Sequence, residues 1–267
     1  AAAQPARPAG TDGRHDSCYR ESMAHTTIEI HTPDGVVDCS RHAPDDGDKH
    51  PAAILFMDAM GLRPAIDELA AHLCAKGYVV LVPNVAYRAG KVAPFDAKTV
   101  WGDEPERKRL QSVLATVHPE GTLRDIGLYL EALEVDAAVK PGPVGAFGYC
   151  MGGVLAIRTA AAFPSRVAAA ASIHGGNLVN DKPNSPHLLA PKIKARVYFG
   201  CADNDRSCTA EDRAALEESF ARAGSRHQIE LYTGKSHGFA VPDTSAFDVA
   251  ACEQHWQRIE ALFKAEL

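Results

Sequence analysis

The stretch FGYCMGG, residues 147–153, joins a short apolar run at 144–147 to a helical pattern that begins at Met151. It has the form glycine-x-nucleophile-x-glycine, which is typical of a sharp turn between a strand and a helix. Here the nucleophile is Cys150, and its neighbours two positions away lack a Cβ that would clash in so tight a turn. The helix N-terminus offers N–H groups that favour a thiolate and stabilise an oxyanion. We predict that Cys150 is a nucleophile and that the Met151 N–H is the first oxyanion donor.

The rest of the chain alternates short apolar runs with helical patterns. Strands are expected at 53–57, 78–82, 144–147, 167–173, 195–199 and 228–232, and helices at 64–76, 104–117, 122–137, 151–163, 210–222 and 246–264. Residues 27–31 and 36–40, joined by a Pro-Asp-Gly turn, predict a hairpin at a sheet edge. Such alternation indicates βαβ units. We predict an α/β fold with a doubly wound, mostly parallel sheet, helices on both faces, and a single domain over residues 23–267.

Composition excludes several classes of function. The chain has 267 residues, 46% of them hydrophobic, and a formal net charge of −6, which argues against a nucleic-acid-binding surface. No apolar run approaches the roughly 20 residues of a membrane helix, so no membrane partner is expected. Seven cysteines without a CxxC pair favour a reducing cytoplasm over a disulfide framework, and no metal-ligand spacing is found. Residues 1–22, rich in Ala, Pro and Gly, are expected to be a disordered extension.

A cysteine nucleophile needs a base, and His237 stands out among the twelve histidines by its place in the glycine-flanked loop GKSHGF, residues 234–239. The base needs an orienting carboxylate. The segment GCADND, residues 200–205, follows the penultimate strand and offers two. We favour Asp205, because residues 205–209 resemble the D-x-x-V-P run that usually follows this acid, and Asp203 remains the competing acid. The order nucleophile, acid, histidine is that of α/β-hydrolases.

These motifs together resemble the dienelactone hydrolase family over about residues 27–265. The resemblance is carried by GYCMGG at 148–153, MDAMG at 57–61, GCADND at 200–205 and SHGF at 236–239. It implies an α/β-hydrolase sheet of eight strands, a Cys–His–Asp triad, and hydrolysis of a small-molecule ester or lactone through an acyl-thioester, without cofactor or metal. Ala59 is the expected second oxyanion donor. Asp58 stands where the family has a glutamate that holds the resting thiol, so we expect it to be the thiol's partner.

Substrate-binding residues are harder to place. Val241 replaces an arginine with which the type enzyme of the family binds its substrate carboxylate, and Arg88, Arg107 and Arg109 are candidate substitutes. The residues expected to line the substrate pocket are His174, Tyr149, Phe239 and Arg88. Two other functions remain open: another acyl-transfer hydrolase on the same triad, such as a thioesterase or peptidase, and a non-catalytic thiol-bearing binding protein. We expect a monomer or small homo-oligomer.

Overall fold

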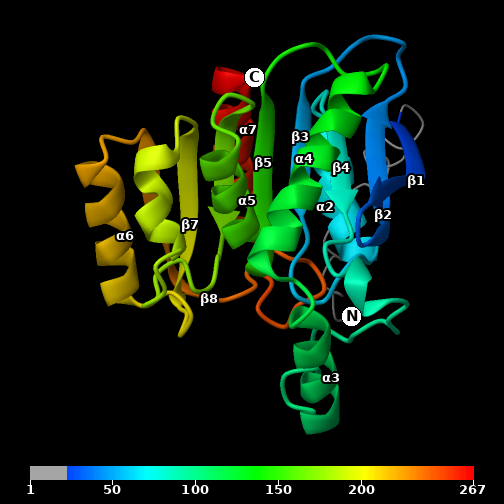
Figure 1. Cartoon of the computed structure of the whole chain (residues 1–267). Helices are drawn as coiled ribbons and strands as arrows, with labels where there is room; N and C mark the ends of the chain where they lie inside the picture. Colours follow the sequence, from blue (N-terminus) through cyan, green and yellow to red (C-terminus); the bar gives the residue numbers. More distant parts are fainter. Residues whose placement is uncertain (1–22) are drawn as a thin grey trace, which may run out of the picture.

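The computed structural model describes residues 23–267 and has one eight-stranded sheet in the order β1-β2-β4-β3-β5-β6-β7-β8 (Figure 1). The extension expected at 1–22 lies outside the described residues. The strands are β1 Met23–Thr32, β2 Gly35–Pro44, β3 Ala52–Phe56, β4 Val79–Pro83, β5 Val144–Tyr149, β6 Val167–Ile173, β7 Arg196–Asn204 and β8 His227–Ser236. β1 and β2 form the predicted edge hairpin, with Ile30 opposite Val37. Strands β3 to β8 are mutually parallel, which confirms the predicted fold class.

Helices cover both faces of the sheet. They are α2 Pro64–Cys74, α3 Glu104–Leu114, α4 Pro119–Val135, α5 Met151–Ala162, α6 Ala210–Arg222 and α7 Val249–Glu266, with 3-10 turns η1 Tyr87–Ala89 and η2 Pro186–Lys192. In Figure 1, α4, α5 and α6 stand in front of the sheet and α7 lies behind it. His72 of α2 stacks on Trp256 of α7 at 4.1 Å between ring centroids, so these two helices share the rear layer.

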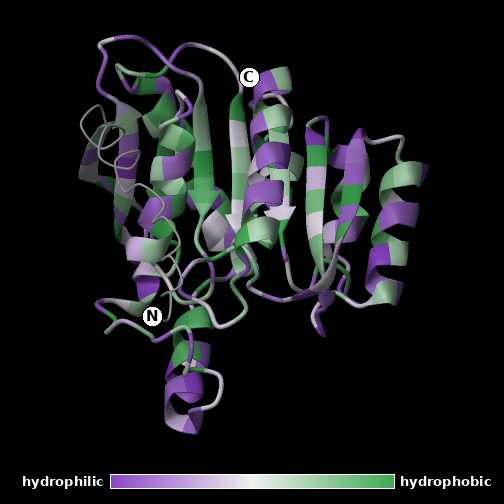
Figure 2. Ribbon diagram, turned by 180° about the vertical axis from the view of Figure 1, so that it is seen from behind, coloured by the Kyte–Doolittle hydropathy of each residue, from purple (hydrophilic) through white to green (hydrophobic). Residues whose placement is uncertain are grey.

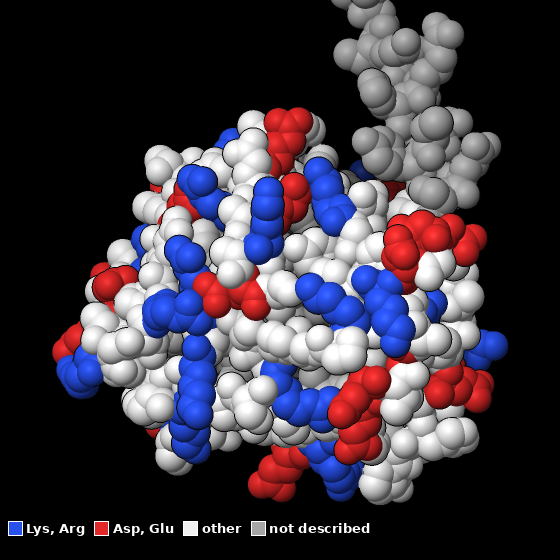
Figure 3. Space-filling model, turned by 90° about the horizontal axis from the view of Figure 1, so that it is seen from above, with Lys and Arg blue, Asp and Glu red and all other residues white. Residues whose placement is uncertain are grey.

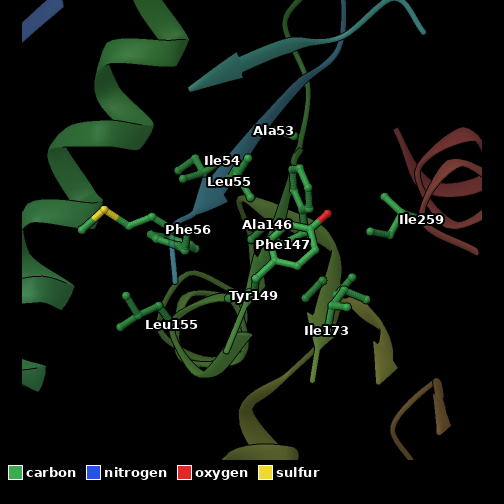
Figure 4. Close-up of a cluster of buried hydrophobic side chains, with 14 of the residues drawn as sticks. Ala53, Ile54, Leu55, Phe56, Ala146, Phe147, Tyr149, Leu155, Ile173 and Ile259 are labelled. Carbon is green, nitrogen blue, oxygen red and sulfur yellow. The ribbon is translucent and has the colours of Figure 1, made fainter. Parts of the chain in front are cut away.

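The core lies between these two layers and the central strands. Ile54, Leu55, Phe56 and Phe147 are all fully buried. Leu155 of α5 and Ile259 of α7 approach the central strands from opposite sides (Figure 4). The central parallel strands are therefore covered by helices on both faces, and the hydrophilic residues of the molecule gather mostly on the helices and loops around them (Figure 2).

Two features go beyond the sequence prediction. β7 continues past residue 199 to Asn204, so Asp203 belongs to a strand. The segment at 85–103, to which the sequence analysis assigned neither a strand nor a helix, leads into α3, which projects from the end of the sheet where the parallel strands finish (Figure 1). No helix of the described part is long and apolar enough to cross a membrane.

Candidate active site

Cys150 sits between β5 and α5 in a strained backbone conformation, with φ 56° and ψ −118°. This is the left-handed region that residues with a Cβ rarely adopt. The Cys150 N–H donates to the Ile173 carbonyl at 3.1 Å, which ties the turn to the neighbouring strand. The thiol is half-buried. The strain therefore places the sulfur at the edge of the sheet, at the N-terminus of a helix.

The glycines around the cysteine are required by close packing. A Cβ on Gly152 would lie 2.1 Å from the Phe56 carbonyl oxygen, and one on Gly148 would lie 2.4 Å from the Gly152 carbonyl carbon. A Cβ on Gly153 would lie 2.4 Å from the Ser172 hydroxyl. Glycine at each of these positions lets α5 start directly against β3, β5 and β6. The doubled glycine is thus part of the architecture of the turn.

His237 and Asp205 meet beside this turn. His237 Nδ1 lies 2.7 Å from Asp205 Oδ2, and the Asp205 carboxylate is buried. The other carboxylate oxygen accepts hydrogen bonds from the Ser207 N–H at 2.8 Å and its hydroxyl at 2.6 Å. Ser207 was not identified from the sequence, although an aspartate two residues before a serine is a familiar turn motif. Asp205 is therefore held from both sides.

Electrostatics favour a charged pair here. Burial opposes the imidazolium, but hydrogen bonds with Asp205 and Cys150 outweigh it and raise the pKa of His237 to about 10. Burial would likewise raise the pKa of Asp205, yet its bonds to His237 and Ser207 keep it below the usual value. The raised pKa favours the protonated imidazole of His237, which Asp205 stabilises from the buried side.

The competing acid does not contact the histidine in this structure. Asp203 Oδ2 accepts from the Gly234 N–H at 3.0 Å, which joins the end of β7 to β8. Along a strand, residues two apart point to the same face, but the chain leaves β7 at Asn204, so Asp205 turns towards His237.

Two backbone amides face the same space as the thiol. Met151 is the first residue of α5, and Ala59 follows β3; both line the cavity that Cys150 and His237 also line. Neither N–H donates a hydrogen bond to another group within residues 23–267. This is the arrangement expected of an oxyanion hole.

Asp58 does not act as the sequence suggested. Its Oδ1 accepts from the Met60 N–H at 2.9 Å and from Arg63 at 2.7 Å, and its Oδ2 accepts from Arg63 at 2.8 Å. Arg63 also binds Asp243 through two hydrogen bonds of 2.6 and 2.9 Å. Burial opposes the charge of Arg63, but these bonds raise its pKa. Asp58 is thus half of an ion pair, and its described hydrogen bonds include none from Cys150.

The thiol opens into a cavity of about 970 Å³. Its apolar lining comes mainly from α5 and the α3 segment, including Leu155, Leu114 and Trp101, and its polar lining includes Arg158 and Lys182. A second hollow of about 550 Å³ lies on the other side of Ala59, towards β2 and β4. Ala59 lines both, so a group bound by its N–H stands at the junction of two spaces.

The predicted pocket residues lie elsewhere. Tyr149, His174 and Phe239 are buried and do not line the cavity: the Tyr149 hydroxyl pairs with His255 at 3.0 Å, and His174 packs edge-on against His237 and Phe239. Arg88 is paired with Asp34 and Asp125. None of these four residues lines the cavity, so the prediction that they bind substrate is wrong. Tyr149, His174 and Phe239 instead pack behind the residues that do line it.

Arg107 and Arg109, the other two candidates for binding a substrate carboxylate, are also bound to groups of the protein itself. Arg107 donates to the Trp101 carbonyl at 3.0 Å. Arg109 pairs with Glu106 and lies over the Phe95 ring at 3.7 Å. Arg158, which the sequence analysis did not consider, lines the cavity in their place.

One group within residues 23–267 has side chains close enough to bind a metal ion. Ligand atoms of His25, His42 and Asp67 lie within 4.8 Å of one another. The Ser40 hydroxyl stands among them, 2.8 Å from His25, 3.1 Å from His42 and 2.6 Å from Asp67. It can donate to the carboxylate and accept from both imidazoles, so these polar groups are satisfied without an ion. The cluster lies on β1, β2 and α2 and does not line the cavity.

A sheet of this topology, with a glycine-flanked cysteine on the turn after β5, defines the fold as that of an α/β-hydrolase. Its residues 38–267 match the model of the dienelactone hydrolase family, and the protein belongs to that family. Among its relatives, the carboxymethylenebutenolidase of Rhodococcus opacus is 27% identical over 229 residues, which cover 85% of each chain.

Solved structures give the same fold. A Klebsiella pneumoniae protein assigned as a dienelactone hydrolase superposes with a TM-score of 0.79 at 19% identity, covering 91% of this chain and 99% of that one. A dienelactone hydrolase-like promiscuous phosphotriesterase from metagenomic libraries gives 0.73 at 21% identity, covering 92% and 99%. At these identities the likeness shows the fold alone.

Proposed function

We propose that this protein hydrolyses a carboxylic ester or lactone through an acyl-thioester on Cys150, with His237 as acid and base and Asp205 as its orienting carboxylate. The observation that supports this most directly is that Cys150 and His237 line one cavity, while His237 is hydrogen-bonded to Asp205 and Asp205 to Ser207 behind it. Family membership and the carboxymethylenebutenolidase relative support an ester or lactone as substrate.

In the first half-reaction the Cys150 thiolate attacks the carbonyl carbon and forms a C–S bond. The carbonyl oxygen takes up the negative charge beside the N–H groups of Met151 and Ala59; removing one such donor typically costs about 100–1000-fold in turnover. The tetrahedral intermediate then breaks its C–O bond, and the His237 imidazolium gives its proton to the departing alkoxide. An acyl-thioester and an alcohol result; from a lactone, both stay in one molecule.

In the second half-reaction the now neutral His237 removes a proton from water, and the hydroxide attacks the thioester carbonyl. The C–S bond breaks, the thiolate returns, and the imidazolium is restored beside Asp205. The carboxylic acid leaves. The steps balance with water as the sole co-reactant.

The test is hydrolysis of p-nitrophenyl esters and small lactones before and after iodoacetamide, with peptide mapping of the alkylated thiol. We expect activity to be lost as Cys150 is modified and to be protected by substrate. Cys150→Ala should lower turnover by about 10³–10⁶-fold. Mass spectrometry of the wild type quenched during turnover should show an acyl adduct on Cys150.

Cys252 provides a matched control. It is also half-buried, but burial raises the pKa of its thiol to about 11, so it is a poor nucleophile at neutral pH. Cys252→Ala should keep wild-type activity and sensitivity to iodoacetamide. Retention of most activity in Cys150→Ala would show that the nucleophile is assigned wrongly.

A further inference from the structure

The cavity beside Cys150 collects positive charge in an acidic protein. Its lining includes Arg158, Lys182 and Arg206, none of which forms an ion pair with an acid within residues 23–267. The acid in the lining, Asp205, is already bound to His237 and Ser207. At the opposite end of the strands the surface differs, because Lys and Arg there are interspersed with Asp and Glu (Figure 3). The cavity therefore carries positive side chains that no acid of residues 23–267 neutralises.

Arg158 is the most unusual of the three. In the described part of the chain, the other arginines with a shifted pKa have it raised by an acid partner: Arg41, Arg63, Arg88, Arg109 and Arg258. Burial alone acts on Arg158, and it lowers the pKa. A half-buried guanidinium without a counter-ion costs free energy, which an anionic ligand can recover.

The position of Arg158 sets the geometry of that ligand. Met151, Val154, Leu155 and Arg158 follow helical spacing on one face of α5, and all four line the cavity. The stripe is apolar until its last member. Trp101 and Leu114 of the α3 segment add further apolar lining to the same cavity. An apolar corridor thus leads from the thiol to a guanidinium.

The length of this corridor follows from helix geometry. At about 1.5 Å per residue, Arg158 lies about 10 Å beyond Met151 along the axis, and its side chain tilts back towards the N-terminus. An aliphatic chain that follows the apolar stripe from the thiol would bring an anion at its far end towards this guanidinium. Because Cys150 directly precedes α5, the helix that carries Arg158, an acyl chain bound at both ends keeps its position through both half-reactions.

We propose that Arg158 is a specificity-determining residue that binds the terminal carboxylate of an aliphatic acyl chain, so that the preferred substrates are half-esters of medium-length dicarboxylic acids. The guanidinium fork matches a carboxylate with two parallel hydrogen bonds. This inference rests on the proposed function of Cys150. The kinetic test below depends on that function, whereas the second test measures binding alone.

The kinetic test compares p-nitrophenyl half-esters of succinate, adipate and suberate with the neutral esters of the same chain length. The quantity measured is the ratio of kcat/KM for charged over neutral ester, in which a general loss of activity cancels. We expect this ratio in the wild type to rise from succinate to adipate and suberate. Arg158→Met should lower the ratio for suberate by about 10–100-fold, mainly through KM.

Two further variants separate local from general effects. Arg158→Lys keeps the charge without the fork and should retain part of the preference. Arg222→Met removes an exposed charge that pairs with Glu218 on α6, and should leave the ratio unchanged. A ratio that falls equally in Arg222→Met would overturn the local role of Arg158.

The second test needs no turnover. Calorimetric titration with suberate should give measurable binding to the wild type and much weaker binding to Arg158→Met. Equal affinity in both, or an unchanged kinetic ratio in Arg158→Met with Cys150-dependent hydrolysis of neutral esters, overturns the role of Arg158 and leaves the proposed function standing. Binding of suberate that depends on Arg158, without hydrolysis of any ester, would instead overturn the proposed function.

Discussion

The two walls of the large cavity treat their polar groups in opposite ways. On the thiol wall, formed by Cys150, His237, Asp205 and Ser207, the histidine is hydrogen-bonded to the aspartate and the aspartate to the serine. On the distal wall, formed by Arg158, Lys182, Trp101 and Leu114, the cations have no acid partner within residues 23–267. Side chains that hydrogen-bond one another are held in fixed positions, as a reaction requires. Charged side chains without a partner in the protein are free to bind a ligand. The contrast therefore separates reaction from recognition.

Breaking the thiol wall at its acid should have the largest effect. Asp205→Asn leaves His237 without the carboxylate that orients it, and we expect kcat/KM to fall on the order of 10³–10⁴-fold. Asp203→Asn is the matched control, because Asp203 accepts from the Gly234 N–H and from no other group of residues 23–267, so its loss should cost less than tenfold. Steady-state kinetics with one p-nitrophenyl ester measure both. The reverse ranking would exchange the two roles.

Loosening the support behind the thiol wall should have a smaller effect. Arg63→Met leaves Asp58, which is 2% exposed, without its partner. We therefore expect the free energy of unfolding to fall by about 3–5 kcal/mol. The Ala59 N–H would move with it, and kcat should fall by about 10–100-fold. Urea unfolding and kinetics check the two effects.

Arg41→Met is the control for this change, since it breaks a similarly buried pair with Asp136 and touches neither cavity. It should lower stability while kcat stays at the wild-type value. Asp243→Asn, which removes the more exposed partner of Arg63, covers the case in which Arg63→Met does not fold. Wild-type kcat in a folded Arg63 or Asp243 variant would refute the positioning role.

The smallest expected effect is a displacement along the pH axis. With the pKa of His237 raised from about 6.5 to about 10, the protonated pair stabilises the fold fully below pH 6.5, and this contribution is lost as the pH rises to about 10. The alkaline limb of kcat/KM should lie near the same value. Asp205→Asn removes a cause of the raised pKa and should move the limb towards neutrality. If the alkaline limb of kcat/KM does not move in Asp205→Asn, the limb does not report the ionisation of His237.

The sequence contained enough information to predict the sheet and to single out Cys150, His237 and Asp205, but not Ser207, on the thiol wall. Apolar runs and glycine positions predicted the sheet and the turn at Cys150, because strand period and close packing are local properties. The family pattern following Asp205 also favoured the residue that the structure places against His237. Asp58 could not be interpreted in this way, because its partner Arg63 binds Asp243 far along the chain.

Substrate recognition was the part the sequence analysis missed, and the reason is orientation. Tyr149 and Phe239 lie next to site residues in sequence but point into the core. The spacing from Met151 to Arg158 was available and identifies a charge on the same helical face as the thiol. What it could not show was that no acid of residues 23–267 pairs with Arg158, because that depends on segments brought together only by folding.

The contact between Gly152 and the Phe56 carbonyl has a consequence for the order of folding. These residues come from segments joined through the parallel pairing of β3 with β5, which spans a long stretch of chain. The strained turn has nothing to hold it until that pairing closes. The thiol therefore acquires its reactive surroundings late, and a nascent chain carries an ordinary cysteine. The alkylation rate of Cys150, measured at intervals during refolding, would thus report when β3 pairs with β5.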